Sequence, residues 1–205
     1  MDKIKLGFAP TRRFVFSKED AYKYKELIRN QIESFELDIE IVDLEGINDE
    51  GLLYNRDEEV TVIKRFQDAR VDALFFPHCN FGTEDIVARI AKEIDKPVLL
   101  WGPRDEAPLE NGMRLRDTQC GMFATGKVLR RFNVPFTYIT NSAVDSEVFE
   151  RGFKNFIGAA NVVKRFKELR ILQISTRPSD FWSVICNEGG IIREIWNSNS
   201  SSHLR

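Results

Sequence analysis

The chain has 205 residues, of which 42% are hydrophobic and 30% are charged, and its formal net charge at pH 7 is −2. This size suits one complete globular domain and part of another, and the near-neutral charge gives no electrostatic case for binding nucleic acid or an anionic membrane. No apolar run approaches the roughly 20 residues that cross a bilayer. Two histidines are too few for a His-rich metal site.

Apolar segments and amphipathic segments alternate along the chain. The first strand is predicted at 3–9, where Pro10 ends it, and Ser17 is placed to cap a helix at 18–35. Strands and helices then continue to alternate, in chain order at 37–42, 57–70, 72–77, 84–94, 97–102, 117–132 and 135–140, with Thr83 placed to cap the helix at 84–94. This order predicts an α/β fold with a Rossmann- or flavodoxin-like parallel sheet and helices on both of its faces.

The segment after the fifth strand predicts the opening of a second domain. A long helix is expected at 145–168 and a sixth strand at 169–175, which either adds to the first sheet or is the first strand of a second domain; the start of another strand–helix unit follows. We therefore expect a Rossmann-like domain over 1–167, the first βα unit of a second α/β domain over 168–189, and an out-of-frame or disordered tail over 190–205.

The three cysteines carry no recognisable motif. Cys79, Cys120 and Cys186 form no CxxC pair, their number is odd, and no apolar leader precedes the first strand, so we expect a cytoplasmic protein. Cys120 falls inside a predicted helix and is expected in the core rather than as a nucleophile. Neither a GxGxxG nor a GxxxxGK[ST] motif occurs, so no nucleotide site is indicated.

Polar loops follow several of the predicted strands. Ligands of open parallel sheets bind beyond the carboxyl ends of the strands, so these loops are the candidate site. In "PHCNFGTED", His78, Asn80 and Phe81 could contact a sugar by hydrogen bonds and stacking. The alternative is an ordinary strand–helix turn.

Arginines in two other loops are further candidates. Arg12 and Arg13 follow the first strand and could hold an anion or orient a polyol, or could simply be solvated. Arg104 follows the fourth strand beside two carboxylates, where an exposed ion pair is the alternative.

A resemblance to a known family is carried by two segments, "CNFGTEDIVARIAKEIDKPVLLWGPRDEAP" and "RLRDTQCGMFATGKVLRRFNVPFTYI". From about residue 4 to Gly189 it resembles the N-terminal region of the L-fucose/L-arabinose isomerase family, in its fucose isomerase-like branch. The resemblance implies a three-domain subunit that interconverts aldoses and ketoses with a divalent metal, usually Mn²⁺, in a homo-oligomer. It also implies that the metal ligands lie in the two later domains, so no metal ligand is assigned here.

The same resemblance implies two contributions of the first domain to a neighbouring subunit's site. One is an arginine after the first strand, which corresponds to Arg12 or Arg13. The other is an aromatic residue after the third strand, where Cys79 stands in the place of a tryptophan and Phe81 keeps an aromatic ring two residues on. Because of this departure, the resemblance does not extend to fucose itself as the substrate.

The end of the chain departs from the family pattern. Codons that allow "GIIREIWNSNS" from Gly190 on can be read one base out of frame as "ELLEKFGIQI", which continues an amphipathic helix into a glycine stop and a strand. We therefore expect a one-base frameshift that truncates a longer isomerase. A natural short protein with a polar tail is the alternative.

Three hypotheses about function follow. The first is the N-terminal portion of a metal-dependent aldose–ketose isomerase of carbohydrate metabolism, inactive alone, with a monosaccharide as its ligand. The second is a stand-alone sugar-binding or regulatory module without catalysis. The third is an interaction domain whose site is vestigial.

Overall fold

The computed structural model describes residues 3–169 and 179–191. It contains a parallel five-stranded sheet in the order β2-β1-β3-β4-β5. The strands are β1 (Ile4–Phe8), β2 (Ile39–Val42), β3 (Ala73–Pro77), β4 (Val98–Trp101) and β5 (Thr137–Tyr138). This is the flavodoxin-like strand order, and it confirms the predicted Rossmann/flavodoxin-like α/β fold.

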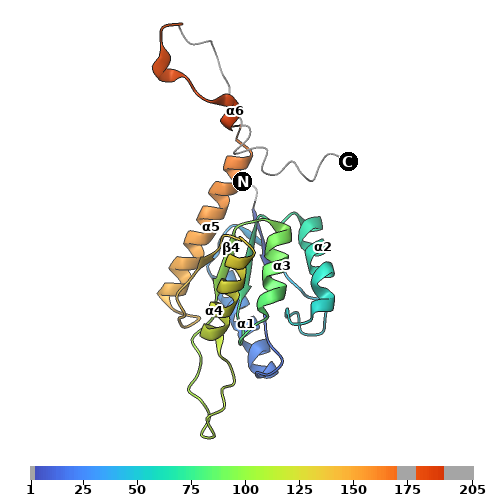
Figure 1. The fold of residues 1–205 in the computed structure, drawn as a ribbon. Coiled ribbons are helices and arrows are strands. Elements are labelled where there is room, and N and C mark those ends of the chain that lie inside the picture. The colour runs from blue at the N-terminus through green and yellow to red at the C-terminus, as the bar shows by residue number, and fades with distance from the viewer. Residues whose placement is uncertain (1–2, 170–178, 192–205) are drawn as a thin grey trace. The chain divides into compact units, whose positions relative to one another are not determined.

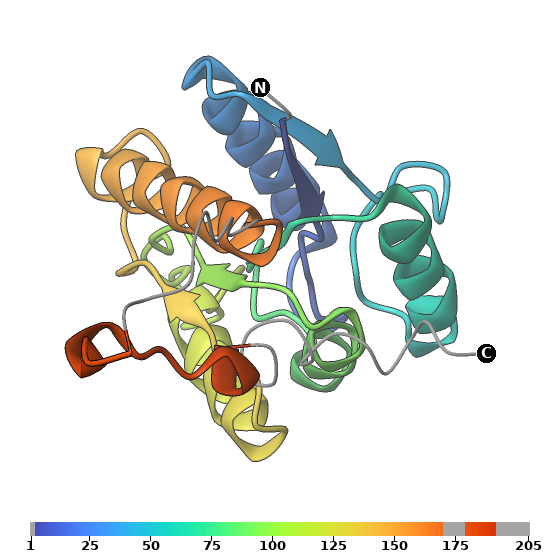
Figure 2. The same cartoon turned by 90° about the horizontal axis from the view of Figure 1, so that it is seen from above.

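Helices cover both faces of the sheet (Figures 1 and 2). They are α1 (Lys18–Ser34), α2 (Glu59–Ala69, preceded by the 3₁₀ turn η1, Arg56–Glu58), α3 (Glu84–Ile94), α4 (Thr118–Arg131) and α5 (Glu147–Lys167). One hydrophobic core joins α1 and α5 to the sheet, and the other joins α2, α3 and α4 to its opposite face. The strands β3 and β4 are buried throughout, as expected for strands covered on both sides.

An aromatic cluster anchors the start of α5. Phe149 and Phe153 are fully buried against Phe75 of β3, and the Trp101 ring stacks on Phe149 with centroids 3.8 Å apart. The Trp101 indole N–H donates to Ser142 Oγ at 3.2 Å, so its one polar atom is satisfied. Each such side chain contributes about 1.5–3 kcal/mol by burial, which fixes α5 on the sheet.

Two predicted helix caps have different outcomes. Ser17 Oγ accepts from the Asp20 N–H at 3.1 Å, so this cap is confirmed. Thr83 stands at the start of α3 but makes no capping bond, and the prediction of a cap there is wrong. Its hydroxyl instead lies 2.9 Å from Thr11 Oγ1, which ties the loop after β3 to the loop after β1.

β5 is much shorter than the predicted 135–140. Among the described strands it pairs only with β4, through Thr137 and Tyr138. Pro135 has no N–H to give to a ladder, which limits pairing at its start.

The chain divides into two compact units, residues 1–161 and 162–205. The described part of the second unit contains the end of α5, the 3₁₀ turn η2 (Trp182–Val184) and α6 (Glu188–Ile191). Nearly all of the predicted sixth strand at 169–175 lies outside the described residues, as does most of the tail at 190–205. The predicted domain boundaries therefore stay predictions.

Candidate functional site

The loops at the carboxyl ends of β1, β2 and β3 are joined by backbone hydrogen bonds. Thr11 forms parallel bridges to both Leu53 and His78. Its N–H donates to Pro77 O at 2.9 Å, and its carbonyl accepts from the Cys79 N–H at 2.9 Å. The sheet is in effect prolonged into the loops, so the side chains carried there are held by the backbone.

Arg12 is buried among these hydrogen-bonded loops. Its Nε and Nη2 donate to the two carboxylate oxygens of Glu50 at 2.6 and 2.9 Å, and its guanidinium lies 3.9 Å from the centre of the Tyr54 ring. Burial alone would raise the pKa of Glu50, but hydrogen bonds from Arg12 and Lys18 outweigh it, and the pKa lies below its ordinary value. The solvated interpretation of Arg12 is therefore wrong.

Arg13 faces the other way and is about one-third exposed. Its guanidinium lies 4.4 Å from the centre of the Phe81 ring, and Nη2 is 3.6 Å from Glu84 Oε2. The Phe81 ring is also stacked with Phe16, with centroids 5.6 Å apart. The structure thus brings Arg13 and Phe81 together, as a cation–π pair at the rim of the site.

Asn80 holds this pair in place. Its amide oxygen accepts from the N–H groups of Arg13 (2.7 Å) and Gly82 (3.2 Å). Its amide nitrogen donates to the carbonyls of Arg13 (3.4 Å) and Ser17 (3.2 Å). All four bonding positions of this buried amide are taken by the loops, which makes Asn80 a positioning residue in this conformation.

His78 lies beneath the same loop and is fully buried. Its Nδ1 lies 2.8 Å from the Phe81 carbonyl, and Nε2 meets no partner among the described residues. Burial lowers the pKa of His78 to about 4, so the ring is neutral at pH 7 and donates from Nδ1. Its imidazole packs against Gly82, where a Cβ would stand 2.6 Å from Nδ1.

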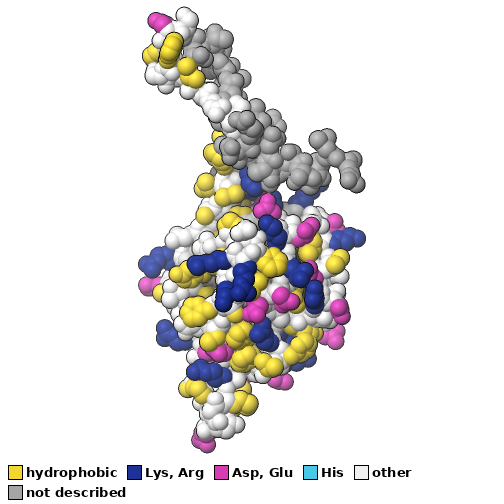
Figure 3. Space-filling model, viewed as in Figure 1, with side chains coloured by type: hydrophobic (Ala, Val, Ile, Leu, Met, Phe, Trp, Pro, Cys, Tyr) yellow, Lys and Arg dark blue, Asp and Glu magenta, His cyan; other side chains and the backbone are white. Residues whose placement is uncertain are grey.

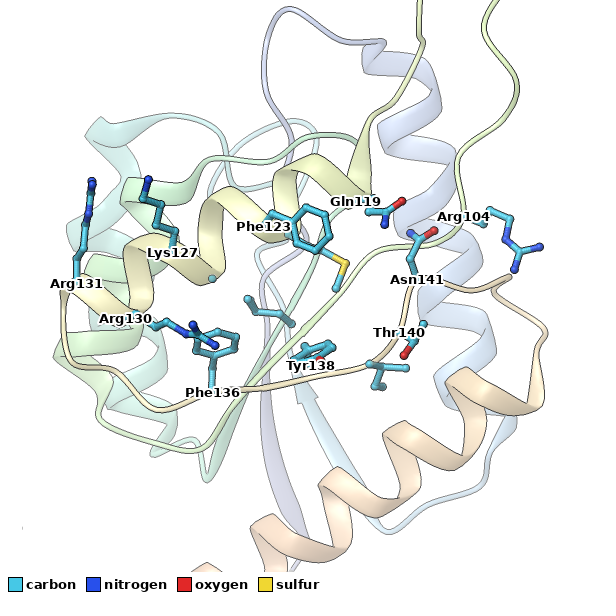
Figure 4. Close-up of a pocket in the computed structure, with 14 residues that line it drawn as sticks. Arg104, Gln119, Phe123, Lys127, Arg130, Arg131, Phe136, Tyr138, Thr140 and Asn141 are labelled. Atoms are coloured by element: carbon cyan, nitrogen blue, oxygen red, sulfur yellow. The ribbon is translucent and has the colours of Figure 1, made fainter.

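Arg104 occupies a different place from the other predicted residues. Its backbone N–H donates to Ser142 O at 2.8 Å, and its exposed side chain lines a groove of about 1030 Å³ together with Gln119 and Asn141 (Figure 4). The groove runs beside β5, whereas Arg13 and Phe81 are carried by the loops after β1 and β3. The residues predicted to bind a ligand are thus divided between two surfaces of the domain.

Sequence reasoning missed Arg116, which organises the long loop after β4. Its buried guanidinium lies 3.5 Å from the centre of the Tyr24 ring, with Nε donating to Glu106 at 3.0 Å and Nη2 to Arg104 O at 2.7 Å. Desolvation, together with the hydrogen bond to Glu106, raises the pKa of Tyr24 to about 12. An arginine in a charged loop gives no sequence signal that distinguishes this anchor from a solvated side chain.

The cysteines differ in exposure. Cys79 is buried, and burial raises the pKa of its thiol to about 12, which suppresses the reactive thiolate. Cys120 is exposed, so its predicted place in the core is wrong. It lies on the side of α4 opposite the buried residues Gly121, Met122 and Thr125.

The described residues do not fit a metal centre. In 3–169 and 179–191, no three His, Cys, Asp or Glu side chains stand where they could hold one ion. Within the same residues, no helix is long and apolar enough to cross a membrane.

The fold and the polar loops define a doubly wound α/β domain with a candidate site at the carboxyl edge of its sheet. Residues 7–167 match the family described as the N-terminal domain of fucose/sulfoquinovose isomerase. The chain therefore belongs to this family, which agrees with the resemblance in the sequence.

Other comparisons are weaker. No curated protein matches the chain. Among solved structures it is similar to an ABC transporter solute binding protein from Bacillus halodurans C-125 with bound myo-inositol, at 8% identity and a TM-score of 0.32. The match covers 77% of this chain and 63% of that protein, so this chain spans less than two thirds of its neighbour's length. A likeness this weak bears on neither ligand nor activity.

Proposed function

We propose that this chain forms one wall of a monosaccharide site in an aldose–ketose isomerase, and that Arg13 is the residue that faces the sugar. The observation that carries the proposal is the arrangement of the two adjacent arginines in a member of this family. Arg12 is neutralised by Glu50 in the interior, whereas Arg13 is presented at the rim on the Phe81 ring. A guanidinium edge offers several N–H donors to the hydroxyl oxygens of a sugar.

Phe81 and Asn80 have supporting parts in this proposal. The Phe81 ring already contacts Phe16 and the Arg13 guanidinium, so it fixes the direction of that group. Asn80 fixes the backbone of Arg13. Holding a polar group in its binding geometry before the ligand arrives reduces the entropic cost of binding.

The chemistry of isomerisation is assigned to the remainder of the enzyme. Moving a proton between neighbouring sugar carbons requires a carboxylate or similar base at the substrate. Beside Arg13 the described residues place Glu84, whose Oε2 already faces the guanidinium at 3.6 Å. We therefore propose that the base and a divalent ion such as Mn²⁺ are held outside this chain, which is inactive alone. Cytoplasmic location and homo-oligomeric assembly belong to the same proposal.

Turnover and binding test the proposal separately. The purified chain, incubated with Mn²⁺ and a panel of aldoses including L-fucose and sulfoquinovose, should give no ketose product, and turnover would overturn the assignment. Saturation-transfer NMR should detect weak binding of a cognate sugar that disappears in Arg13→Gln. The matched control is Lys64→Gln, which removes one exposed cation on α2. Loss of binding in both variants, or in neither, contradicts the role of Arg13.

Calorimetry separates this function from the stand-alone binding module. A single wall should bind sugar too weakly for a resolved isotherm. A tight isotherm without metal would make the chain a complete sugar-binding module and would refute the wall proposal.

A further inference from the structure

A groove lies along β5, one of the two outer strands of the described sheet. Its volume is about 1030 Å³, and its walls come from α4 and from the segment that contains β5 (Figure 4). Phe123 and Tyr138 stand in it with exposed fractions of 69% and 65%. No described strand pairs with the outer side of β5. Exposed aromatic rings beside an open strand edge are typical of surfaces that bind protein.

The segment around this groove is basic. Residues 118–144 contain no Asp or Glu, although the whole chain has 32 acidic residues. The segment contains Lys127, Arg130 and Arg131, none of which forms an ion pair with a described residue. Lys and Arg side chains and hydrophobic side chains lie next to one another on the face that carries α4 (Figure 3). Because the net charge of the chain is −2, the remainder of the chain is acidic.

The opposite edge of the same sheet carries the opposite charge. β2 is the other outer strand, and residues 33–40, "ESFELDIE", contain four acids and no cation. Two of the four have partners: Glu33 bonds Arg29 at 3.1 Å, and Glu40 lies 3.8 Å from Lys5. Glu36 and Asp38 are exposed and form no ion pair within the described part of the chain.

The topology aligns these two sets of charges. Arg130 and Arg131 end α4 just before β5, and Glu36 and Asp38 link α1 to β2. Both sets therefore lie at the amino-terminal edge of the parallel sheet. If β2 of a second copy follows β5 in the same direction, the sheet continues in parallel and the acids come alongside the cations. A symmetric dimer in which β5 pairs with β5 would bring no acidic side chain to these cations, because no described Asp or Glu lines the groove.

We propose that the β5 groove binds the acidic β2 edge of a second copy of this chain, head to tail. Strand addition supplies backbone hydrogen bonds, the aromatic rings supply buried area, and the charges select the partner edge. A head-to-tail contact closes into a ring where the rotation between copies allows it and otherwise forms open chains. This inference is independent of the proposed sugar site, since it uses neither Arg13 nor Phe81.

The test is sedimentation velocity on the full chain at low and at high ionic strength. The wild-type chain should associate at low salt and dissociate toward its 23.8 kDa monomer at high salt. The double reversals Arg130→Glu with Arg131→Glu and Glu36→Lys with Asp38→Lys should each weaken association at least about a hundredfold, because like charges then face each other.

Mixing and control variants make the result specific. An equimolar mixture of the two double reversals should associate again, since each supplies the edge that the other needs. Lys64→Glu with Lys92→Glu, an equal charge change on the exposed surfaces of α2 and α3, should behave as the wild type, and circular dichroism should show all variants folded. A wild-type monomer at high concentration and low salt, reversals that still associate, or a mixture that stays monomeric would each overturn the proposal.

Discussion

Replacement of Glu50 by Gln should destabilise the protein strongly. The Glu50 and Arg12 side chains are only 8% and 4% exposed, and two short hydrogen bonds join them. The amide cannot accept both guanidinium donors as a carboxylate does, so a buried cation loses its counter-charge. Removing one partner of a buried pair costs about 3–5 kcal/mol. For a chain of this length, a loss of about 3 kcal/mol lowers Tm by roughly 6–12 °C.

Urea denaturation at several pH values is the measurement. The pKa of Glu50 is lower in the folded state, so its stabilising effect is complete above the ordinary carboxyl pKa and is lost as pH falls through the folded value. E50Q should therefore lose most stability near neutrality and converge on the wild type in acid. The double variant R12M/E50L should recover part of the loss, because no buried charge is then left unpaired and Lys18, which loses Glu50, is exposed to solvent. A cost below about 1 kcal/mol at pH 7 would mean that solvent screens the pair and would refute this reasoning.

Three further predictions use the same loops and the cysteines. The His78 imidazole should show no titration by NMR between pH 8 and 5, because burial depresses its folded pKa to about 4. The free energy of unfolding should therefore fall by about 3 kcal/mol as the pH drops from 6.5 to 4. An ordinary titration near pH 6.5 would contradict the burial of this ring. Gly82→Ala should destabilise the protein by more than about 2 kcal/mol in chemical denaturation, since φ is +78° and the new Cβ meets the His78 imidazole. The control Gly46→Ala, where φ is +77° but the space is open, should cost only about 1 kcal/mol. Equal costs would argue against the close contact at Gly82. A thiol reagent should label Cys120 in the native chain and Cys79 only after unfolding; rapid native labelling of Cys79 would show that the loop opens.

The layered fold could be predicted from the sequence because short apolar runs, which form the buried strands, alternate with segments whose apolar residues recur at helical spacing. The sequence was less informative about which side of a helix is buried and where a strand begins and ends. Helical spacing alone did not show that Cys120 lies on the outer side of α4. The segment from 135 to 140 predicts a longer strand than the two residues, Thr137 and Tyr138, that pair with β4 in the described part of the chain.

The candidate site could be predicted only as a set of loops. Arg12 and Arg13 are identical residue types next to each other, and what separates them is Glu50, which lies 38 residues away. Arg116 depends in the same way on Tyr24 and Glu106, which the chain brings together only after folding. Contacts of this kind are tertiary and leave no periodic signal.

The different fates of the two arginines follow from their positions on an extended backbone. The Arg12 N–H is bound to Leu53 O at 3.1 Å and the next N–H, that of Arg13, to Asn80 Oδ1 at 2.7 Å, so consecutive residues are tied to different neighbours. Deleting Thr11, the one residue between Pro10 and Arg12, would move Arg13 into the inward position that faces Glu50 and bury its guanidinium. The number of residues between β1 and the arginines therefore decides which arginine faces outward, more than the identity of those residues does. Among family members, those that keep its spacing should keep the outward-facing position, whatever residue occupies it.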